Sequence, residues 1–93
     1  MPAYLPELVN GVLAHQDELD AQIESKLAPG WTLSRLARPD LVILRLALYE
    51  LEYTQVPNAV AINEALRLAH DFSDEKSYRF INGVLGSIES EQN

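Results

Sequence analysis

Aromatic and basic side chains come together in residues 72–80, the one segment of this sequence that is typical of a nucleic-acid site. Lys76 and Arg79 lie beside Phe80, just after Ser73, which is predicted to cap a helix. Free N–H groups at a helix start can hold a phosphate, and an aromatic ring can stack on an unpaired base. The two acidic residues after Ser73 oppose this interpretation, and Phe80 in a purely structural core role is the alternative.

Other patterns that carry chemistry are weaker. His70 and Asp74 have the spacing of a two-ligand metal site, but two ligands are too few and a helix boundary is predicted between them. Glu50 and Glu64 form a conceivable acid–base pair, although Arg45 or the backbone is expected to satisfy them. The sequence has no cysteine, no phosphate-cradling glycine loop and no serine–histidine–aspartate arrangement. We therefore predict no enzyme, no cofactor and no metal site.

Arg45 interrupts the most apolar stretch of the chain, and Glu64 lies in the next predicted helix. A buried charge needs a partner. We predict that these two side chains meet across the helix pair. The alternative is that both extend to the surface.

Length and charge limit the function further. The 93 residues suit one domain, and the net charge of −7 does not attract nucleic acid through the overall field. Any RNA contact must come from a local basic patch or from a partner. The sequence contains neither a secretory signal nor an apolar run long enough to cross a membrane, and the lack of cysteine fits a cytoplasmic location.

Hydrophobic spacing predicts an all-α fold, a compact bundle of about five helices in one domain, residues 1–93. The expected helices cover residues 4–27, 32–36, 39–51, 60–72 and 73–88. The first is a single long amphipathic helix within residues 1–30, and the third is apolar all round, as a central helix is. Gly83 is expected to let a neighbouring helix approach, and the polar tail 89–93 to be frayed.

Several of these segments carry recognisable motifs. They are W-T-L-S-R-L (31–36), I-L-R-L-A-L-Y-E-L (43–51), V-P (56–57), V-A-I-N-E-A (60–65), L-A (68–69) and F-I-N-G-V-L (80–85). In this order and spacing they resemble the NusB family of transcription antitermination factors, whose core would span residues 31–88. Residues 4–12 are similar to the helix that precedes the tryptophan in that family.

The resemblance implies an all-helical protein that binds boxA RNA together with NusE, which is also a small-subunit ribosomal protein, in antitermination on ribosomal RNA operons. It implies RNA contacts for Lys76, Arg79 and Phe80, and a contact with the protein partner for Asp40. Such proteins usually begin with an arginine-rich helix and a second helix, and the similarity starts after both. RNA binding is therefore expected to be weakened or lost, and the alternative function is a NusB-like protein-interaction module without RNA binding.

The same difference predicts uncovered apolar surface on the first helix of this chain. Its apolar positions there are Leu5, Leu8, Val9 and Val12. Because a contiguous apolar patch invites self-association, we expect a homodimer or an exchange of helices between chains.

Overall fold

The computed structural model describes residues 5–92, with side chains from residue 6 onward, and within this range the chain is helical without a strand. Tyr4, where the first helix was expected to begin, lies outside the described residues. The elements are α1 (Leu5–Ala14), α2 (Gln16–Glu24), the 3₁₀ turn η1 (Leu33–Arg35), α3 (Arg38–Tyr53), α4 (Asn58–Phe72) and α5 (Glu75–Glu91). The predicted all-α bundle is confirmed. α5 continues through Glu91, into the segment that was expected to be frayed.

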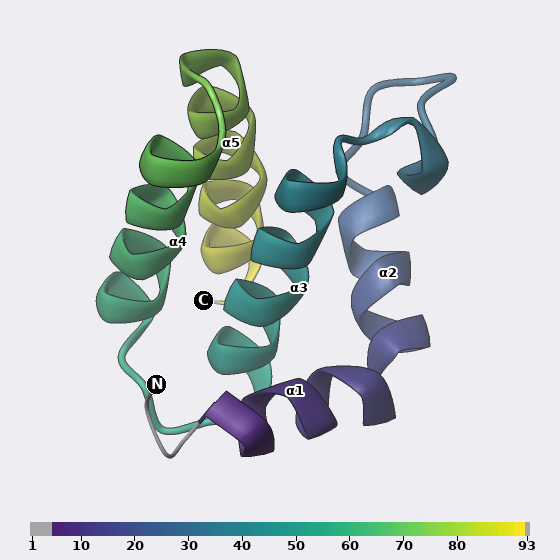
Figure 1. The fold of residues 1–93 in the computed structure, drawn as a ribbon. Coiled ribbons are helices and arrows are strands. Elements are labelled where there is room, and N and C mark those ends of the chain that lie inside the picture. Colours follow the sequence, from purple (N-terminus) through teal and green to yellow (C-terminus); the bar gives the residue numbers. More distant parts are fainter. Residues whose placement is uncertain (1–4, 93) are drawn as a thin grey trace.

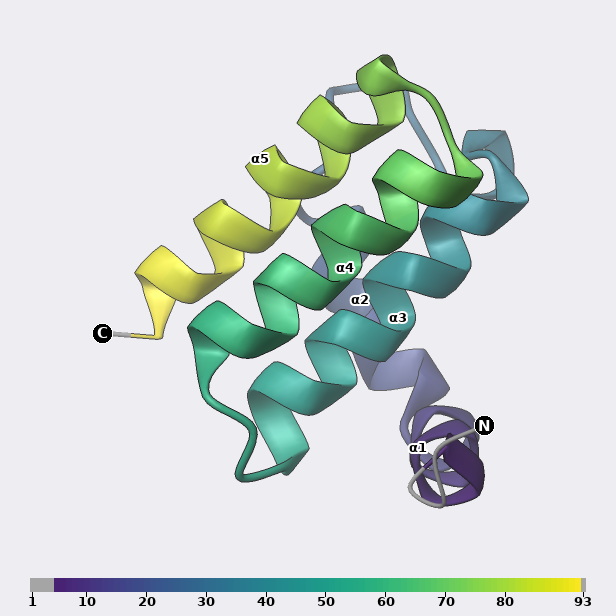
Figure 2. The same cartoon turned by 60° about the vertical axis from the view of Figure 1, so that its left-hand side comes forward.

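Helix α3 lies at the centre of the bundle. Its apolar side chains point in several directions, and Leu44 and Leu48 are completely buried. Such a helix must be covered on more than one side. α4 and α5 cover it on one side, α2 on the other, and α1 crosses its lower end (Figure 1). Figure 2 shows α3, α4 and α5 side by side, with α1 seen almost end on. Among the described residues, no helix is long and apolar enough to cross a bilayer.

The prediction of one long helix over residues 4–27 is wrong, because the chain bends at His15 between α1 and α2. A straight helix over that range would be about 36 Å long, whereas the 16 residues of α3 span about 24 Å. Part of the straight helix would have no surface to pack on. The bend lets α1 and α2 bury apolar residues against two different parts of α3 (Figure 1). The hydrophobic spacing continues through the bend, so it did not reveal the break.

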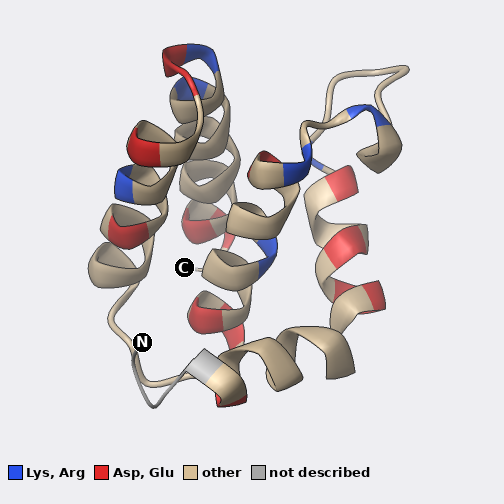
Figure 3. Cartoon of the chain, viewed as in Figure 1, with Lys and Arg blue, Asp and Glu red and all other residues tan. Residues whose placement is uncertain are grey.

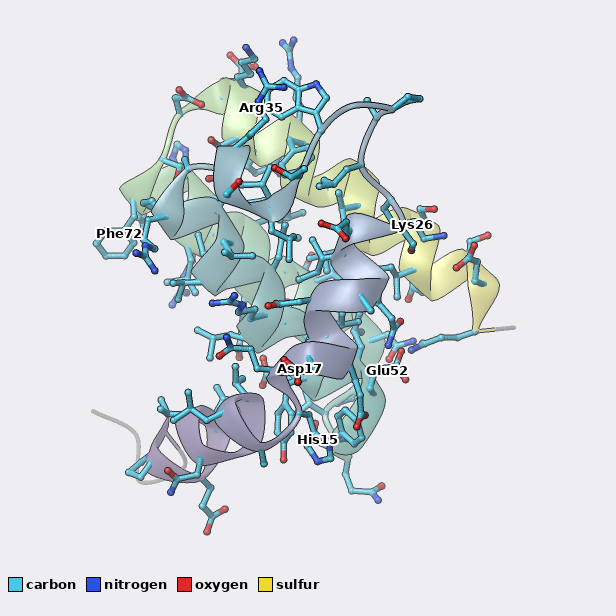
Figure 4. All side chains as sticks on the ribbon, turned by 90° about the vertical axis from the view of Figure 1, so that its right-hand side faces the viewer. His15, Asp17, Lys26, Arg35, Glu52 and Phe72 are labelled. Carbon is cyan, nitrogen blue, oxygen red and sulfur yellow. The ribbon has the colours of Figure 1, made fainter. Side chains whose placement is uncertain are left out.

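Aromatic contacts hold the bend in place. The His15 ring stacks on Tyr53 with 4.1 Å between centroids, and the Tyr53 hydroxyl donates to Glu18 at 2.6 Å. This hydrogen bond lowers the pKa of Glu18 and raises the pKa of Tyr53. The Tyr49 ring occupies the space that a Cβ on Gly11 would need, so any larger residue at this position would have to displace the ring. His15 lies where α1 meets α2 (Figure 4).

The prediction that a neighbouring helix closely approaches Gly83 is wrong. A Cβ on Gly83 would meet no atom within 4 Å, because this residue lies on the exposed side of α5. The glycine that is closely approached is Gly11 on α1, and the group that approaches it is the Tyr49 side chain of α3, not a helix backbone.

Arg45 forms its ion pair with Asp20 of α2. Its Nε donates to Oδ1 at 2.8 Å and its Nη2 to Oδ2 at 2.9 Å, and the two side chains are only 17% and 19% exposed. The predicted pairing of Arg45 with Glu64 is wrong. Arg45 projects toward α2, whereas Glu64 lies exposed on α4, which packs on another side of α3 (Figure 1).

Candidate nucleic-acid interface

A cavity of about 640 Å³ opens between the α2–α3 connection (residues 25–37) and the first turns of α5. This volume lies within the range of about 300–1,000 Å³ that is usual for ligand sites. Four of the seven basic residues of the chain line it, together with two aromatic rings: Lys26, Arg35, Lys76, Arg79, Trp31 and Phe80. Figure 3 shows basic segments at the start of α5 and along the α2–α3 connection, with an acidic segment beside the basic ones at the start of α5. Asp40 and Asp74 also line the cavity, so basic side chains outnumber acidic ones there by four to two, although the chain has a net charge of −7.

The wall formed by the α2–α3 connection presents Trp31. Gly30 has a φ of +86°, in the left-handed region that favours glycine, and the turn leaves the Trp31 side chain 48% exposed. The Arg35 guanidinium carbon lies 4.9 Å from the Trp31 ring centroid, and its Nη1 donates to the Gly30 carbonyl at 3.3 Å. One turn thus exposes the indole and also fixes the cation that stacks on it. Arg35 lies at the edge of the molecule (Figure 4).

The wall formed by α5 presents the three residues predicted from the sequence. Lys76 and Arg79 are exposed, and Phe80 is half-buried, with part of its ring packed against the core. Arg79 forms an exposed ion pair with Glu75 at 3.1 Å, one turn back on the helix. Because exposed pairs of this kind contribute little, the guanidinium can exchange this partner for a phosphate at small cost.

The cap of α5 is Asp74, and the prediction that Ser73 is the cap is wrong by one residue. The Asp74 carboxylate accepts the N–H of Ser77 at 2.8 Å, and this bond holds the pKa of the carboxyl below its usual value. Ser73 ends α4, and its hydroxyl turns back toward α3. The acidic cap occupies part of the positive end of α5, so the helix start is not a free anion site.

Asp40 joins the two walls of the cavity. It is only 6% exposed, and its carboxylate accepts the hydroxyls of Ser73 at 3.1 Å and Ser77 at 2.8 Å. A residue at the start of α3 therefore fixes both the α4–α5 turn and the first turn of α5. The carboxylate is engaged inside the chain, and its expected contact with a protein partner stays a prediction.

The cavity brings together the four residues for which the family resemblance implies a contact: Asp40, Lys76, Arg79 and Phe80. Their role in RNA contact stays a prediction. Sequence reasoning missed Lys26, Trp31 and Arg35, which lie about 45 residues earlier in the chain. Lys26 is 15% exposed and forms an ion pair with Glu91 at the opposite end of α5, so it attaches the α2–α3 connection to that helix. The available signal was the pair Pro29-Gly30 directly before the tryptophan, which is typical of a turn.

Comparison with known proteins decides the family. Residues 1–90 of the chain match the NusB family. This chain belongs to the NusB family. The resemblance inferred from the sequence motifs is confirmed, and with it the class of protein: NusB proteins are transcription antitermination factors and not enzymes.

Individual relatives agree over nearly the whole chain. The transcription antitermination protein NusB of Limosilactobacillus reuteri strain DSM 20016 is 61% identical, over 100% of this chain and 68% of its own length. That of Levilactobacillus brevis strain ATCC 367 is 65% identical, over 91% of this chain and 61% of its own. The solved structure of T. maritima NusB matches with a TM-score of 0.86 and 35% sequence identity. The match covers 91% of this chain and 60% of the T. maritima chain. The chain thus spans about two thirds of the length of its NusB relatives.

Proposed function

We propose that this chain is a transcription antitermination factor of NusB type that binds boxA RNA together with the NusE-type small-subunit ribosomal protein. One observation carries the proposal. Within an acidic chain, most of the basic side chains line a single cavity that also contains two aromatic rings. Lysine and arginine neutralise phosphates, and aromatic rings stack on unpaired bases, so the combination fits single-stranded RNA.

Each predicted residue has a distinct role in this proposal. Lys76 and Arg79 are exposed, and both can turn toward the phosphates that pass the start of α5 once Arg79 leaves its exposed ion pair with Glu75. Phe80 lines the cavity and is also packed against the core, so in this proposal its ring is the surface on which a base stacks. Because only a few phosphates are contacted, the logarithm of the binding constant should fall only slowly with the logarithm of the salt concentration. The expected slope is about 0.7 per neutralised phosphate on a single strand.

The test is fluorescence anisotropy of a labelled boxA RNA, with and without the NusE-type protein, at two salt concentrations. Lys76→Glu should weaken RNA binding at least about tenfold, the loss expected when a phosphate contact becomes a repulsion. Arg67→Glu is the matched control, since it changes the net charge equally at an exposed position of α4 outside the cavity. Equal losses in the two variants would mean that only total charge matters, and the proposed site would be wrong.

Asp40 is proposed to lie at the edge of the surface that meets the ribosomal protein. It lines the same cavity from the start of α3, so RNA and protein would adjoin there. The test is binding of the NusE-type protein, in the absence of RNA, to Asp40→Asn. A weaker protein complex supports this role, whereas unchanged protein binding with weaker RNA binding leaves Asp40 as a residue that positions α5.

The alternative function is a protein-interaction module that self-associates and no longer binds RNA. It is favoured by a second, apolar cavity of about 540 Å³ between α1, α3 and α4. The reasoning that predicted a homodimer needs a correction, because Leu8 and Val12 are buried at 7% and 8% exposure. The exposed apolar residues of α1 are Val9 and Leu13, and the Leu5 side chain lies outside the described residues. Light scattering over a concentration series tests the homodimer, and a monomer at high micromolar concentration would contradict it.

A further inference from the structure

Trp31 is a large apolar side chain that remains about half exposed, and the structure orients it without covering it. Arg35 stacks on the indole at 4.9 Å and is itself held by the Gly30 carbonyl at 3.3 Å. The indole also lines the 640 Å³ cavity that Phe80 lines from α5. A tryptophan with only a packing role would be expected to bury most of its ring, because that burial is the main gain a large aromatic side chain provides.

We infer that Trp31 and Arg35 form a second stacking platform, and that the cavity between Trp31 and Phe80 holds one unpaired nucleobase. The inference rests on the proposed RNA binding and adds the residues that define the base pocket. A nucleobase has two apolar faces and a polar edge, which matches a cavity with an aromatic ring on each of two walls. Lys76 and Arg79 lie on the same cavity and take the adjoining phosphates. A paired base is excluded, since its faces are already stacked in the duplex.

The guanidinium of Arg35 adds to the stack. A cation on one face of an indole is attracted by the ring, and it limits rotation of the ring. In the inferred site the base stacks on the indole face that Arg35 leaves free, and Phe80 lies on the other wall of the cavity. Arg35 is a positioning residue in this arrangement, because it acts through the indole, whereas Trp31 contacts the base directly.

The chain contains a single tryptophan, so its fluorescence reports on this cavity alone. Unlabelled boxA RNA is titrated into the protein, with the NusE-type protein added where the complex needs it, and the change in tryptophan emission is followed. Tryptophan in the partner is replaced by phenylalanine where it is present. Anisotropy of the labelled RNA is measured in parallel. We expect quenching that saturates with the same affinity that anisotropy gives.

Two variants and one modified RNA make the result specific. Trp31→Ala should weaken binding about 5- to 150-fold, the range that corresponds to stacking of one base, whereas Trp31→Phe should retain most of it. A series of boxA RNAs, each with one abasic position, should contain one member for which Trp31→Ala has no further effect. A purely structural role for Trp31 would weaken binding of every RNA in the series equally. Circular dichroism of both variants checks that they are folded.

The outcomes separate this inference from the function on which it rests. Anisotropy that reports binding while tryptophan emission stays constant would overturn the base pocket and leave the proposed RNA binding intact. If Trp31→Ala weakened the binding of every abasic RNA equally, the base pocket would likewise be overturned and the proposed RNA binding would stand. An absence of binding in both measurements, with and without the ribosomal protein, would overturn the proposed function and the base pocket together.

Discussion

The ion pair between Arg45 and Asp20 gives the sharpest test of how α2 is attached to α3. Two parallel hydrogen bonds of 2.8 and 2.9 Å join them, and both side chains are about four-fifths buried. Arg45→Met keeps much of the aliphatic volume but leaves the Asp20 carboxylate without its cation. Asp20→Asn leaves the guanidinium with a neutral partner that can accept only one of the two bonds.

The expected size follows from the burial. Exposed pairs contribute about 0.2–1 kcal/mol, and breaking a fully buried pair costs about 3–5 kcal/mol. A pair that is mostly buried lies between these values, so Arg45→Met should lower the free energy of unfolding by about 2 kcal/mol. For a domain of this size that corresponds to a Tm lower by about 8–16 °C. The double variant should cost less than the sum of the singles, with a coupling of about 1–2 kcal/mol.

The assay is urea unfolding followed by circular dichroism for the wild type, the two single variants and the double variant. A second cycle replaces Asp20→Asn by Glu64→Gln, and it should show no coupling to Arg45→Met because Glu64 lies exposed on α4. Coupling to Glu64 as large as that to Asp20 would refute the assignment of the pair. Single variants that each cost under about 0.5 kcal/mol would place this pair among the exposed ones.

Four further substitutions test other parts of the structure. Gly11→Ala should destabilise the chain by about 1–3 kcal/mol in urea unfolding, because the new methyl group overlaps the Tyr49 ring. Gly83→Ala, at an open position of α5, is the control and should stabilise the chain by about 0.5–1 kcal/mol. A Gly11→Ala variant as stable as the wild type would contradict the close contact. Asp40→Ala should cost about 1–3 kcal/mol, since two serine hydroxyls lose their buried acceptor, and a cost near zero would show that the bonds contribute nothing. The pKa of Asp74 is lowered on folding by the backbone N–H bond at the helix start, so its contribution to stability is present above the unfolded-state pKa and is lost as pH falls through the folded value. The Tm difference between wild type and Asp74→Asn should shrink over that acidic range, and a constant difference would contradict the cap.

Sequence patterns predicted the helices whose apolar spacing is a local property of the chain. They failed where the outcome depends on how one helix packs against another. α3, α4 and α5 were found because their apolar spacing, or in α3 the apolar residues all round, is a local property of the chain. The bend at His15 was missed because α1 and α2 keep one continuous spacing, and only the limited length of α3 forces them apart. Arg45 was recognised as needing a partner, but its direction around α3 depends on the rotation of the helix, which sequence alone does not fix.

The site shows the same limit. Lys76, Arg79 and Phe80 lie within about one helical turn, so their proximity follows from the sequence. Trp31 joins them only because the fold places the α2–α3 connection across the cavity from the first turns of α5. Asp40 is the link, because its bonds to Ser73 and Ser77 hold the first turn of α5 beside the start of α3. The geometry of the basic cavity therefore depends on a buried acid. A substitution of Asp40 should weaken RNA binding even though the carboxylate itself would repel a phosphate. Loss of RNA binding in an Asp40 variant is therefore evidence of lost positioning and not of a lost RNA contact.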